Sequence, residues 1–219
     1  MFGTNAKLPF EKGDGNSLKI HSIFETIQGE GPYCGHQAIF IRLSGCNLAC
    51  KFCDTDFDDY KLLLNTDILD KIKSFSQIKP LIVITGGEPF RQNISQLCAL
   101  LIQNNYKIQL ETNGTLYSNI PKEVELVCSP KISNGKYSLI RDDILNQAIA
   151  IKFLISSNNK SYSDISEVGQ TKHNIPVYVQ PMDEYNDEIN HKNIILAQKI
   201  AKKHKAILSL QIHKILNID

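Results

Sequence analysis

Three cysteines in this sequence are spaced so that they could bind one inorganic centre. Cys46, Cys50 and Cys53 form a C-x3-C-x2-C motif. Thiolates are soft ligands that favour iron–sulfur clusters or zinc. A structural zinc site normally has four protein ligands, whereas a reactive centre keeps one position open. A trio of thiolates therefore favours a four-iron cluster whose fourth iron is free to bind a small molecule.

The alternative is a zinc site completed by a neighbouring side chain. Cys34, His36 and His21 are the available fourth ligands. The chain has no second C-x2-C pair and no H-x3-H pair that would make such a site regular. The ligand count favours the cluster, but spacing alone leaves both interpretations open.

The composition argues against nucleic-acid and membrane partners. Lys and Arg number 24 and Asp and Glu 23, with no block of like charge. No apolar run approaches the roughly 20 residues of a membrane span, and the N-terminus does not look like a secretory signal. The six cysteines are therefore expected to be ligands or packing residues rather than disulfides, with Cys98 and Cys128 buried. We expect a cytoplasmic protein.

Alternating strand and helix patterns predict an α/β fold. The expected strands are 19–26, 37–43, 81–85, 107–112, 125–128, 148–155, 177–179 and 206–211. The expected helices are 66–75, 93–104 and 187–203, with short ones near 142–146 and 164–168. Convincing helices are few, and a full eight-fold barrel takes about 250 residues. We therefore expect a partial (β/α) barrel of about six mostly parallel strands with reduced helices.

The expected domain organisation is a flexible leader followed by one domain. Residues 1–18 show no periodicity and are expected to be the leader, and 19–219 the domain. Polar signatures fall at the ends of several of the expected strands. Because the carboxyl ends of parallel strands share one edge, these residues should converge on one site. They are Cys46, Gly86, Glu111, Ser129 and Gln180.

The cysteine motif after one strand and Gly86-Gly87-Glu88-Pro89 after another resemble the radical S-adenosylmethionine enzymes. In that superfamily three cysteines bind a [4Fe-4S] cluster, and the open iron binds S-adenosylmethionine. The G-G-E-P loop supports the amino group of the methionine. Such a donor needs carbonyl and carboxylate acceptors, and paired glycines let the backbone come close.

Further blocks resemble the 7-carboxy-7-deazaguanine synthase family within that superfamily. They are FETIQGEG at 24–31, FIRLSGCNL at 40–48, CDT at 53–55, ETNGT at 111–115, SPK at 129–131, QPMD at 180–183 and LQIHK at 210–214. The resemblance implies conversion of 6-carboxy-5,6,7,8-tetrahydropterin to 7-carboxy-7-deazaguanine with loss of ammonia, a step toward queuosine. It implies hydrogen abstraction by a 5′-deoxyadenosyl radical followed by ring contraction. The implied cofactors are a [4Fe-4S] cluster, S-adenosylmethionine and Mg²⁺.

The resemblance also implies roles for individual residues. Cys46, Cys50 and Cys53 would hold the cluster, and Thr55 would bind Mg²⁺. The implied substrate-binding residues are Ile27, Gln28, Gly29, Arg42 and Thr85. The implied cofactor-binding residues are Phe52, Cys53, Asp54, Gly87, Glu88, Glu111, Ser129, Pro130, Lys131, Gln180, Pro181, Met182 and Asp183. A guanidinium such as that of Arg42 suits bidentate binding of a substrate carboxylate.

Each of these roles has a plainer alternative. Without the resemblance, Arg42 would be a surface ion-pair residue, Thr55 a loop-capping hydroxyl and Glu111 a carboxylate at a strand end. His213 and Lys214 lie in a matching block, but the tail after them departs from the family pattern, so Asp219 is given no role.

Two other functions were weighed. An enzyme that installs a glycyl radical on a partner protein would share the cysteine trio, but Thr55 and the block at 28–31 argue against it. A structural metal-binding module would give the G-G-E-P loop no purpose. The leading interpretation implies a small pterin substrate, a reducing partner such as flavodoxin, and a homodimer.

Overall fold

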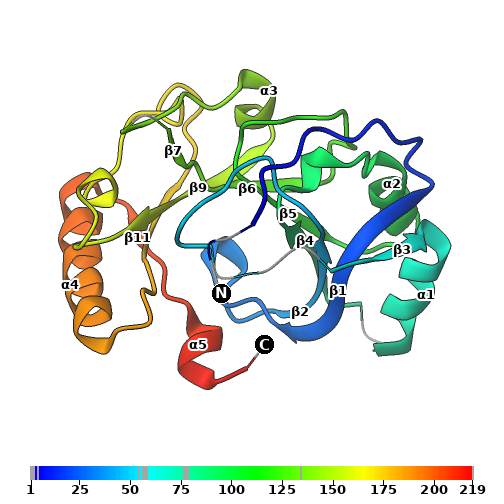
Figure 1. Ribbon diagram of the computed structural model, residues 1–219, viewed down its shortest axis with the longest axis horizontal. Coiled ribbons are helices and arrows are strands. Elements are labelled where there is room, and N and C mark those ends of the chain that lie inside the picture. Colours follow the sequence, from blue (N-terminus) through cyan, green and yellow to red (C-terminus); the bar gives the residue numbers. More distant parts are fainter. Residues whose placement is uncertain are drawn as a thin grey trace. The chain divides into compact units, whose positions relative to one another are not determined.

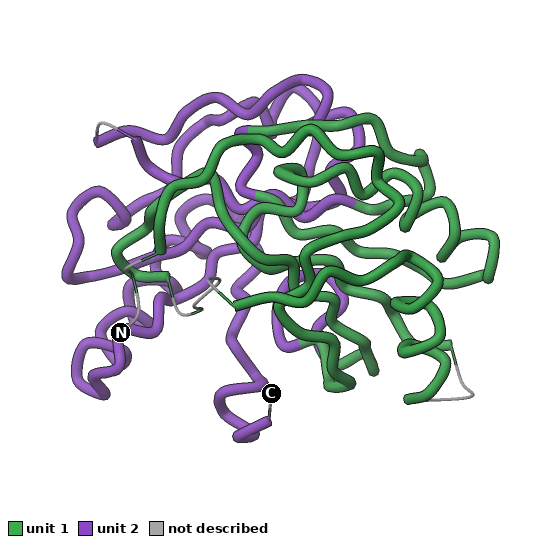
Figure 2. Tube along the Cα trace, turned by 45° about the vertical axis from the view of Figure 1, so that its right-hand side comes forward, with its two compact units in different colours: residues 1–28, 35–112, 116–125 green, residues 29–34, 113–115, 126–219 purple. Residues whose placement is uncertain are grey.

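The computed structural model describes residues 3, 5–53, 55, 59–75, 79–133 and 135–218, which form two compact units (Figure 2). Unit 1 takes in residues 1–28, 35–112 and 116–125. Unit 2 takes in residues 29–34, 113–115 and 126–219. The expectation of a single domain over 19–219 stays a prediction.

Unit 1 contains a mixed sheet covered by two helices (Figure 1). Its strands are β1 (Ser17–Ile27), β2 (Gln37–Leu43), β3 (Lys61–Leu64), β4 (Leu81–Gly86) and β5 (Ile108–Thr112), in the order β3-β1-β2-β4-β5. Strands β2, β4 and β5 are parallel, and β1 is antiparallel to both β2 and β3. The helices are α1 (Asn65–Phe75) and α2 (Ser95–Gln103), with a 3-10 turn, η2 (Pro89–Arg91), after β4.

Apolar side chains explain why these segments form this sheet. Residues 81–84 of β4 are all buried, which is typical of a strand covered on both faces. Ile39, Ile41 and Leu43 of β2 are fully buried beside it. Along α2, Leu97, Cys98 and Leu101 are buried at helical spacing. The expected burial of Cys98 is confirmed, as is that of Cys128 in unit 2.

Unit 2 contains a parallel sheet in the order β6-β9-β10-β11. These strands are β6 (Glu125–Cys128, in unit 2 from Leu126 on), β9 (Ala148–Ile155), β10 (Val177–Pro181) and β11 (Ile207–Leu208). The helices are α3 (Asp142–Leu145), α4 (Asp187–His204) and α5 (Ile212–Leu216), with 3-10 turns η1 (Gly31–Tyr33) and η3 (Lys160–Tyr162) and a hairpin of β7 (Ile132–Ser133) and β8 (Lys136–Tyr137). Ala197, Ile200 and Ala201 of α4 pack on Ile155 and Val179 of the sheet.

Several short elements differ from the sequence-based expectations. The helix expected near 164–168 is absent, because side chains take the backbone groups it would need: Gln170 accepts from Val168 N at 2.7 Å and donates to Ser166 O at 2.9 Å. The strand expected over 206–211 is only β11. Strand β3 and helix α5 were not expected, and β1 begins at Ser17, inside the expected leader.

The helices in the described part of the chain lack the combination of length and hydropathy that a membrane span requires.

Candidate active site

The loop that carries the three cysteines, residues 44–53 and here called the cysteine loop, begins directly after β2. The backbone is tightly packed at its start. Gly45 has φ +78°, and a Cβ placed there would lie 2.5 Å from Nη2 of Arg91. Any other residue would be strained by its φ and would also displace a buried guanidinium. The first ligand candidate, Cys46, is the next residue.

The G-G-E-P loop meets the cysteine loop backbone to backbone. Gly87 N donates to Leu43 O and Glu88 N donates to Gly45 O, each at 3.0 Å. A Cβ on Gly87 would lie 1.9 Å from Gly45 O and 2.9 Å from Cys46 N. Because β2 and β4 are parallel and aligned, their carboxyl ends bring the two motifs together. The predicted convergence of Cys46 with Gly86-Gly87 is confirmed.

Glu88 ties this loop to the end of β5. Its side chain is fully buried, and Oε1 accepts from Phe90 N at 3.1 Å and from Thr112 Oγ1 at 2.8 Å. The first contact caps the η2 turn. The carboxylate therefore holds the loop in place, and the expected contact between Glu88 and the cofactor stays a prediction.

The thiol of Cys46 lies in a setting that favours its neutral form. Burial raises the pKa of Cys46 to about 11, and the nearby charges of Glu88, Cys50 and Cys53 act in the same direction, while a hydrogen bond from Leu48 N opposes them. A thiol with such a pKa becomes a thiolate at neutral pH when a metal ion binds it.

Cys46, Cys50 and Cys53 are donors of the kind that an iron–sulfur cluster takes. The cysteine donors, their count and the close backbone approach at Gly87 suit the cluster.

Arg42 and Thr55 are brought together beside the cysteine loop. Arg42 Nη1 donates to Thr55 Oγ1 at 2.9 Å, and the guanidinium lies 5.5 Å from the centre of the Phe24 ring. The Phe24 ring in turn stacks on Phe40, with ring centres 5.5 Å apart. The residue expected to bind a carboxylate therefore contacts the residue expected to bind Mg²⁺. Asp54 lies outside the described residues.

Gln28 and Glu111, both expected at the site, are also in contact. Gln28 is buried, and its Nε2 donates to Glu111 Oε1 at 3.2 Å. Gln109 Nε2 donates to the same oxygen at 2.9 Å. Sequence reasoning missed Gln109; the signal for it was a glutamine between the apolar residues Ile108 and Leu110 of β5.

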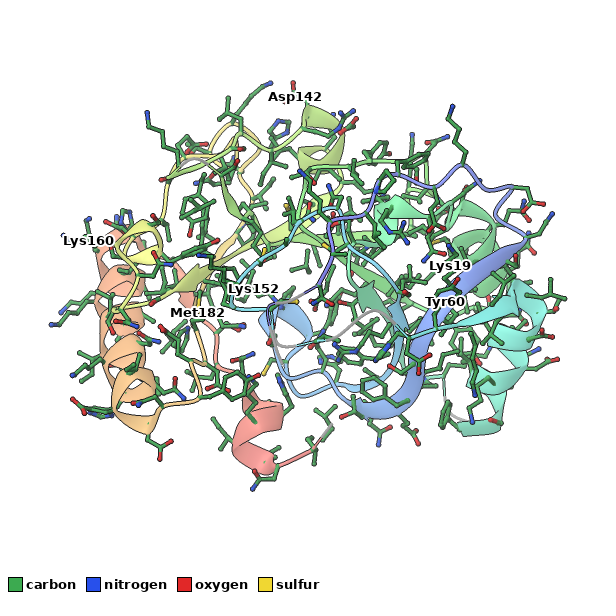
Figure 3. All side chains as sticks on the ribbon, viewed as in Figure 1. Lys19, Tyr60, Asp142, Lys152, Lys160 and Met182 are labelled. Atoms are coloured by element: carbon green, nitrogen blue, oxygen red, sulfur yellow. The ribbon has the colours of Figure 1, made fainter. Side chains whose placement is uncertain are left out.

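Unit 2 presents Ser129, Lys131, Met182 and Asp183 just after the ends of its strands β6 and β10. Lys131 folds back so that Nζ donates to Ser129 O at 2.7 Å. After β10, Asp183 pairs with Lys214 at 2.6 Å, which joins the block at 180–183 to the block at 210–214. Met182 (labelled in Figure 3) is buried next to Asp183.

A buried ion pair in unit 2 was not anticipated. Lys152 of β9 (labelled in Figure 3) pairs with Glu30, which also accepts from Gln211 Nε2 at 2.8 Å. Burial would raise the pKa of Glu30, but the charge of Lys152 and hydrogen bonds from Lys152, Gln211 and Gln180 lower it to about 2. The signal in the sequence was a single lysine within the apolar run of β9.

The described part of the expected leader contacts the cysteine loop, while its expected flexibility stays a prediction. Leu8 N donates to Cys46 O at 2.8 Å, and Lys7 forms a parallel β-bridge with Cys46. Glu11 pairs with Arg91 at 2.7 Å. These backbone and charged contacts hold the leader against the cysteine loop, although no apolar periodicity marks it.

Comparison with known proteins agrees with this geometry. A family model described as the radical SAM superfamily matches residues 40–132. The 7-carboxy-7-deazaguanine synthase of Rickettsia prowazekii is 52% identical over 225 residues, which cover 100% of this chain and 96% of the relative. The synthase of Rhodospirillum rubrum is 33% identical over 240 residues, which cover 100% of both chains.

A solved structure bears on the fold. The crystal structure of QueE from Escherichia coli matches with a TM-score of 0.70 at 24% identity, covering 89% of this chain and 94% of that one. It confirms the predicted α/β fold with a mostly parallel sheet, and the predicted partial barrel is consistent with it. The full-length relatives decide the family: this chain belongs to the 7-carboxy-7-deazaguanine synthase family of radical S-adenosylmethionine enzymes.

Proposed function

We propose that this enzyme converts 6-carboxy-5,6,7,8-tetrahydropterin to 7-carboxy-7-deazaguanine with loss of ammonia. The 52% identity with a synthase over the whole chain carries this proposal. The enzyme uses a [4Fe-4S] cluster and S-adenosylmethionine, which when bound supply the radical chemistry, while the chain binds, orients and shields the reactants. Cys46, Cys50 and Cys53 are proposed to hold the cluster.

Arg42 and Thr55 are proposed to bind the substrate carboxylate and Mg²⁺. Their hydrogen bond places a guanidinium and a hard hydroxyl oxygen next to each other. A carboxylate can accept two parallel bonds from the guanidinium, and Mg²⁺ prefers oxygen ligands from protein and substrate. A bound carboxylate would also separate the two positive charges.

The other assignments are proposals of the same kind. Substrate contacts are proposed for Ile27, Gln28, Gly29 and Thr85. Cofactor contacts are proposed for Phe52, Asp54, Gly87, Glu88, Glu111, Ser129, Pro130, Lys131, Gln180, Pro181, Met182 and Asp183. A flavodoxin-type reductant, a homodimer and a cytoplasmic location complete the proposal.

The test is an anaerobic assay of the reconstituted enzyme with a reductant, S-adenosylmethionine and the carboxypterin. We expect 7-carboxy-7-deazaguanine and 5′-deoxyadenosine, with activity lost on chelation of Mg²⁺ and regained on its return. Cleavage of S-adenosylmethionine with no deazaguanine would contradict the proposal and favour a different radical substrate, such as a partner protein.

The Arg42→Lys variant tests the carboxylate site. We expect KM for the pterin to rise about tenfold, because one charge-assisted hydrogen bond is lost. Arg141→Lys is the matched control, since Arg141 is an exposed residue paired with Asp143. Equal KM values for the two variants would contradict a role for Arg42 in substrate binding.

A further inference from the structure

Residues 5–11, here called the N-terminal strap, run along the cysteine loop within unit 1. The strap pairs with the first ligand candidate through the parallel Lys7–Cys46 bridge, in which Leu8 N donates to Cys46 O at 2.8 Å. This pairing uses backbone groups and so fixes the path of the chain at Cys46. The strap is thus part of the wall around the cluster loop.

At one end of the strap, Asn5 contacts the other end of the same loop. Its Nδ2 donates to Thr55 O at 2.6 Å and to Cys53 Sγ at 3.4 Å. The Cys53 thiol itself donates to Thr55 O at 3.4 Å. A thiolate that binds iron has no proton to donate. Asn5 then serves as a donor both to the sulfur and to the carbonyl.

At its other end the strap is fastened by a buried cation. Arg91 is only 2% exposed, and its Nη1 lies 2.7 Å from Glu11 Oε1 and 3.1 Å from Pro9 O. Arg91 Nη2 donates to Ser44 O at 3.2 Å, and Glu11 N donates to Arg91 O at 2.8 Å. One guanidinium therefore joins the strap to the start of the cysteine loop.

Glu11 has a second cationic partner. Lys19 Nζ lies 2.9 Å from Glu11 Oε1 and 5.2 Å from the centre of the Tyr60 ring, and Figure 3 shows Lys19 and Tyr60 near each other. Burial raises the pKa of Glu11, but hydrogen bonds from Lys19 and Arg91 outweigh it and keep the pKa below its ordinary value. The anchor of the strap is therefore charged at neutral pH.

We propose that Asn5 is a positioning residue for the iron–sulfur cluster, donating a hydrogen bond to the Cys53 sulfur and holding Thr55 beside it. Reduction adds negative charge to a cluster, and donors to its sulfurs stabilise that charge. Asn5 should thus raise the reduction potential and slow the loss of iron. The inference rests on the cluster assigned to this family, and it concerns residues that family membership does not single out.

The experiment compares wild-type enzyme with Asn5→Ala and Asn5→Asp, each anaerobically reconstituted and checked for folding by circular dichroism. A redox titration followed by electron paramagnetic resonance gives the midpoint potential, and a chelator assay gives the rate of iron release. Both variants should have lower potentials, Asn5→Asp the lower, because its carboxylate cannot donate and adds negative charge. Iron release should be about tenfold faster, the scale on which outer partners of metal ligands act.

Lys12→Ala serves as the matched control, since Lys12 is an exposed residue just beyond the strap; it should keep wild-type values. Potentials and release rates of the Asn5 variants equal to those of the control would overturn the inference. Neither readout depends on product formation. A wild-type chain that bound no cluster would contradict the proposed function. A wild-type chain that bound the cluster, with Asn5 variants that behave like the control, would contradict only the role of Asn5.

Discussion

Among the described residues, each unit has an ion pair whose cation is buried, but the two pairs are built around opposite charges. In unit 1 the cation is the centre: Arg91 contacts the Glu11 carboxylate and the carbonyl oxygens of Pro9 and Ser44. In unit 2 the anion is the centre: Glu30 accepts from Lys152, Gln211 and Gln180. The side-chain exposures are 2% for Arg91 and 29% for Glu11, against 5% for Lys152 and 16% for Glu30.

The two networks differ because a guanidinium and a carboxylate bind different kinds of partner. A guanidinium has five donors in a rigid fork, so it can connect separate stretches of backbone. A carboxylate has only acceptors, so it can gather the donor side chains of several strands. Arg91 therefore fastens chain segments around the cysteine loop, whereas Glu30 collects side chains from β9, β10 and the segment after β11.

The largest effect is expected from removing the anionic centre. Glu30→Gln leaves the Lys152 ammonium buried without its countercharge, which typically costs about 3–5 kcal/mol. Urea unfolding followed by circular dichroism measures the change. Glu188→Gln is the matched control, because Glu188 forms an exposed pair with Lys192, and exposed pairs of this kind contribute little to stability.

A double variant sharpens this result. Glu30→Gln combined with Lys152→Met removes both charges, and replacing both members of a buried pair is often neutral. The double variant should therefore be more stable than Glu30→Gln alone. A double variant no more stable than Glu30→Gln would mean that the pair is not coupled and that Glu30 is not the centre of the network.

A smaller loss of stability is expected for Arg91→Lys, which keeps the positive charge but removes the guanidinium and its several donors. In Arg91→Lys the ammonium can still pair with Glu11 but cannot also reach both carbonyl oxygens. We expect a loss of about 1.5–3 kcal/mol, the scale of one hydrogen bond to a charged group. Thermal unfolding and iron content measure stability and cluster loading together.

The control for this substitution is again Arg141→Lys, at an exposed pair. Arg91→Lys should lower both stability and iron content, because Arg91 packs against Gly45 next to Cys46. An unchanged iron content despite lower stability would show that the Arg91 guanidinium stabilises unit 1 but is not needed for the cysteine loop to hold iron.

The sequence predicted the parts of this molecule that depend on local pattern. The buried run of β4 and the polar motif at its end were sufficient to place the G-G-E-P loop beside the cysteine loop, because parallel strands share one edge. The long helix α4 was also predictable from its apolar face. Short elements such as β3 and α5 were not, since few residues carry their pattern.

The two buried ion pairs could not be predicted, because their partners are remote in sequence. Arg91 contacts Pro9 across 82 residues, and Lys152 contacts Glu30 across 122 residues. A charged residue is ordinarily exposed, and nothing local shows that a countercharge will cover it. For the same reason, nothing local in the expected leader predicts its bond to Cys46.

The last prediction concerns how protonation of Glu30 changes the free energy of unfolding. This effect is smallest at neutral pH and grows as the pH falls. Its pKa of about 2 in the folded chain lies below the ordinary value of 4.5. A carboxylate whose pKa is lowered by folding stabilises the folded state above its unfolded pKa. That contribution is lost as the pH falls from about 4.5 toward 2. Acid should therefore weaken the wild-type network progressively.

The double variant Glu30→Gln/Lys152→Met lacks this titration, so its stability should fall less than that of wild type over the same range. Both chains are compared without cluster, because acid protonates thiolate ligands. Glu11, whose pKa is also lowered, is present in both and cancels. The free energy of unfolding of the double variant, relative to that of wild type, should therefore rise as the pH drops from about 6 to about 3, as measured by urea unfolding. Curves that stay parallel would mean that Glu30 carries no charge-dependent stability, and the contrast between an anion-centred and a cation-centred pair would then rest on geometry alone.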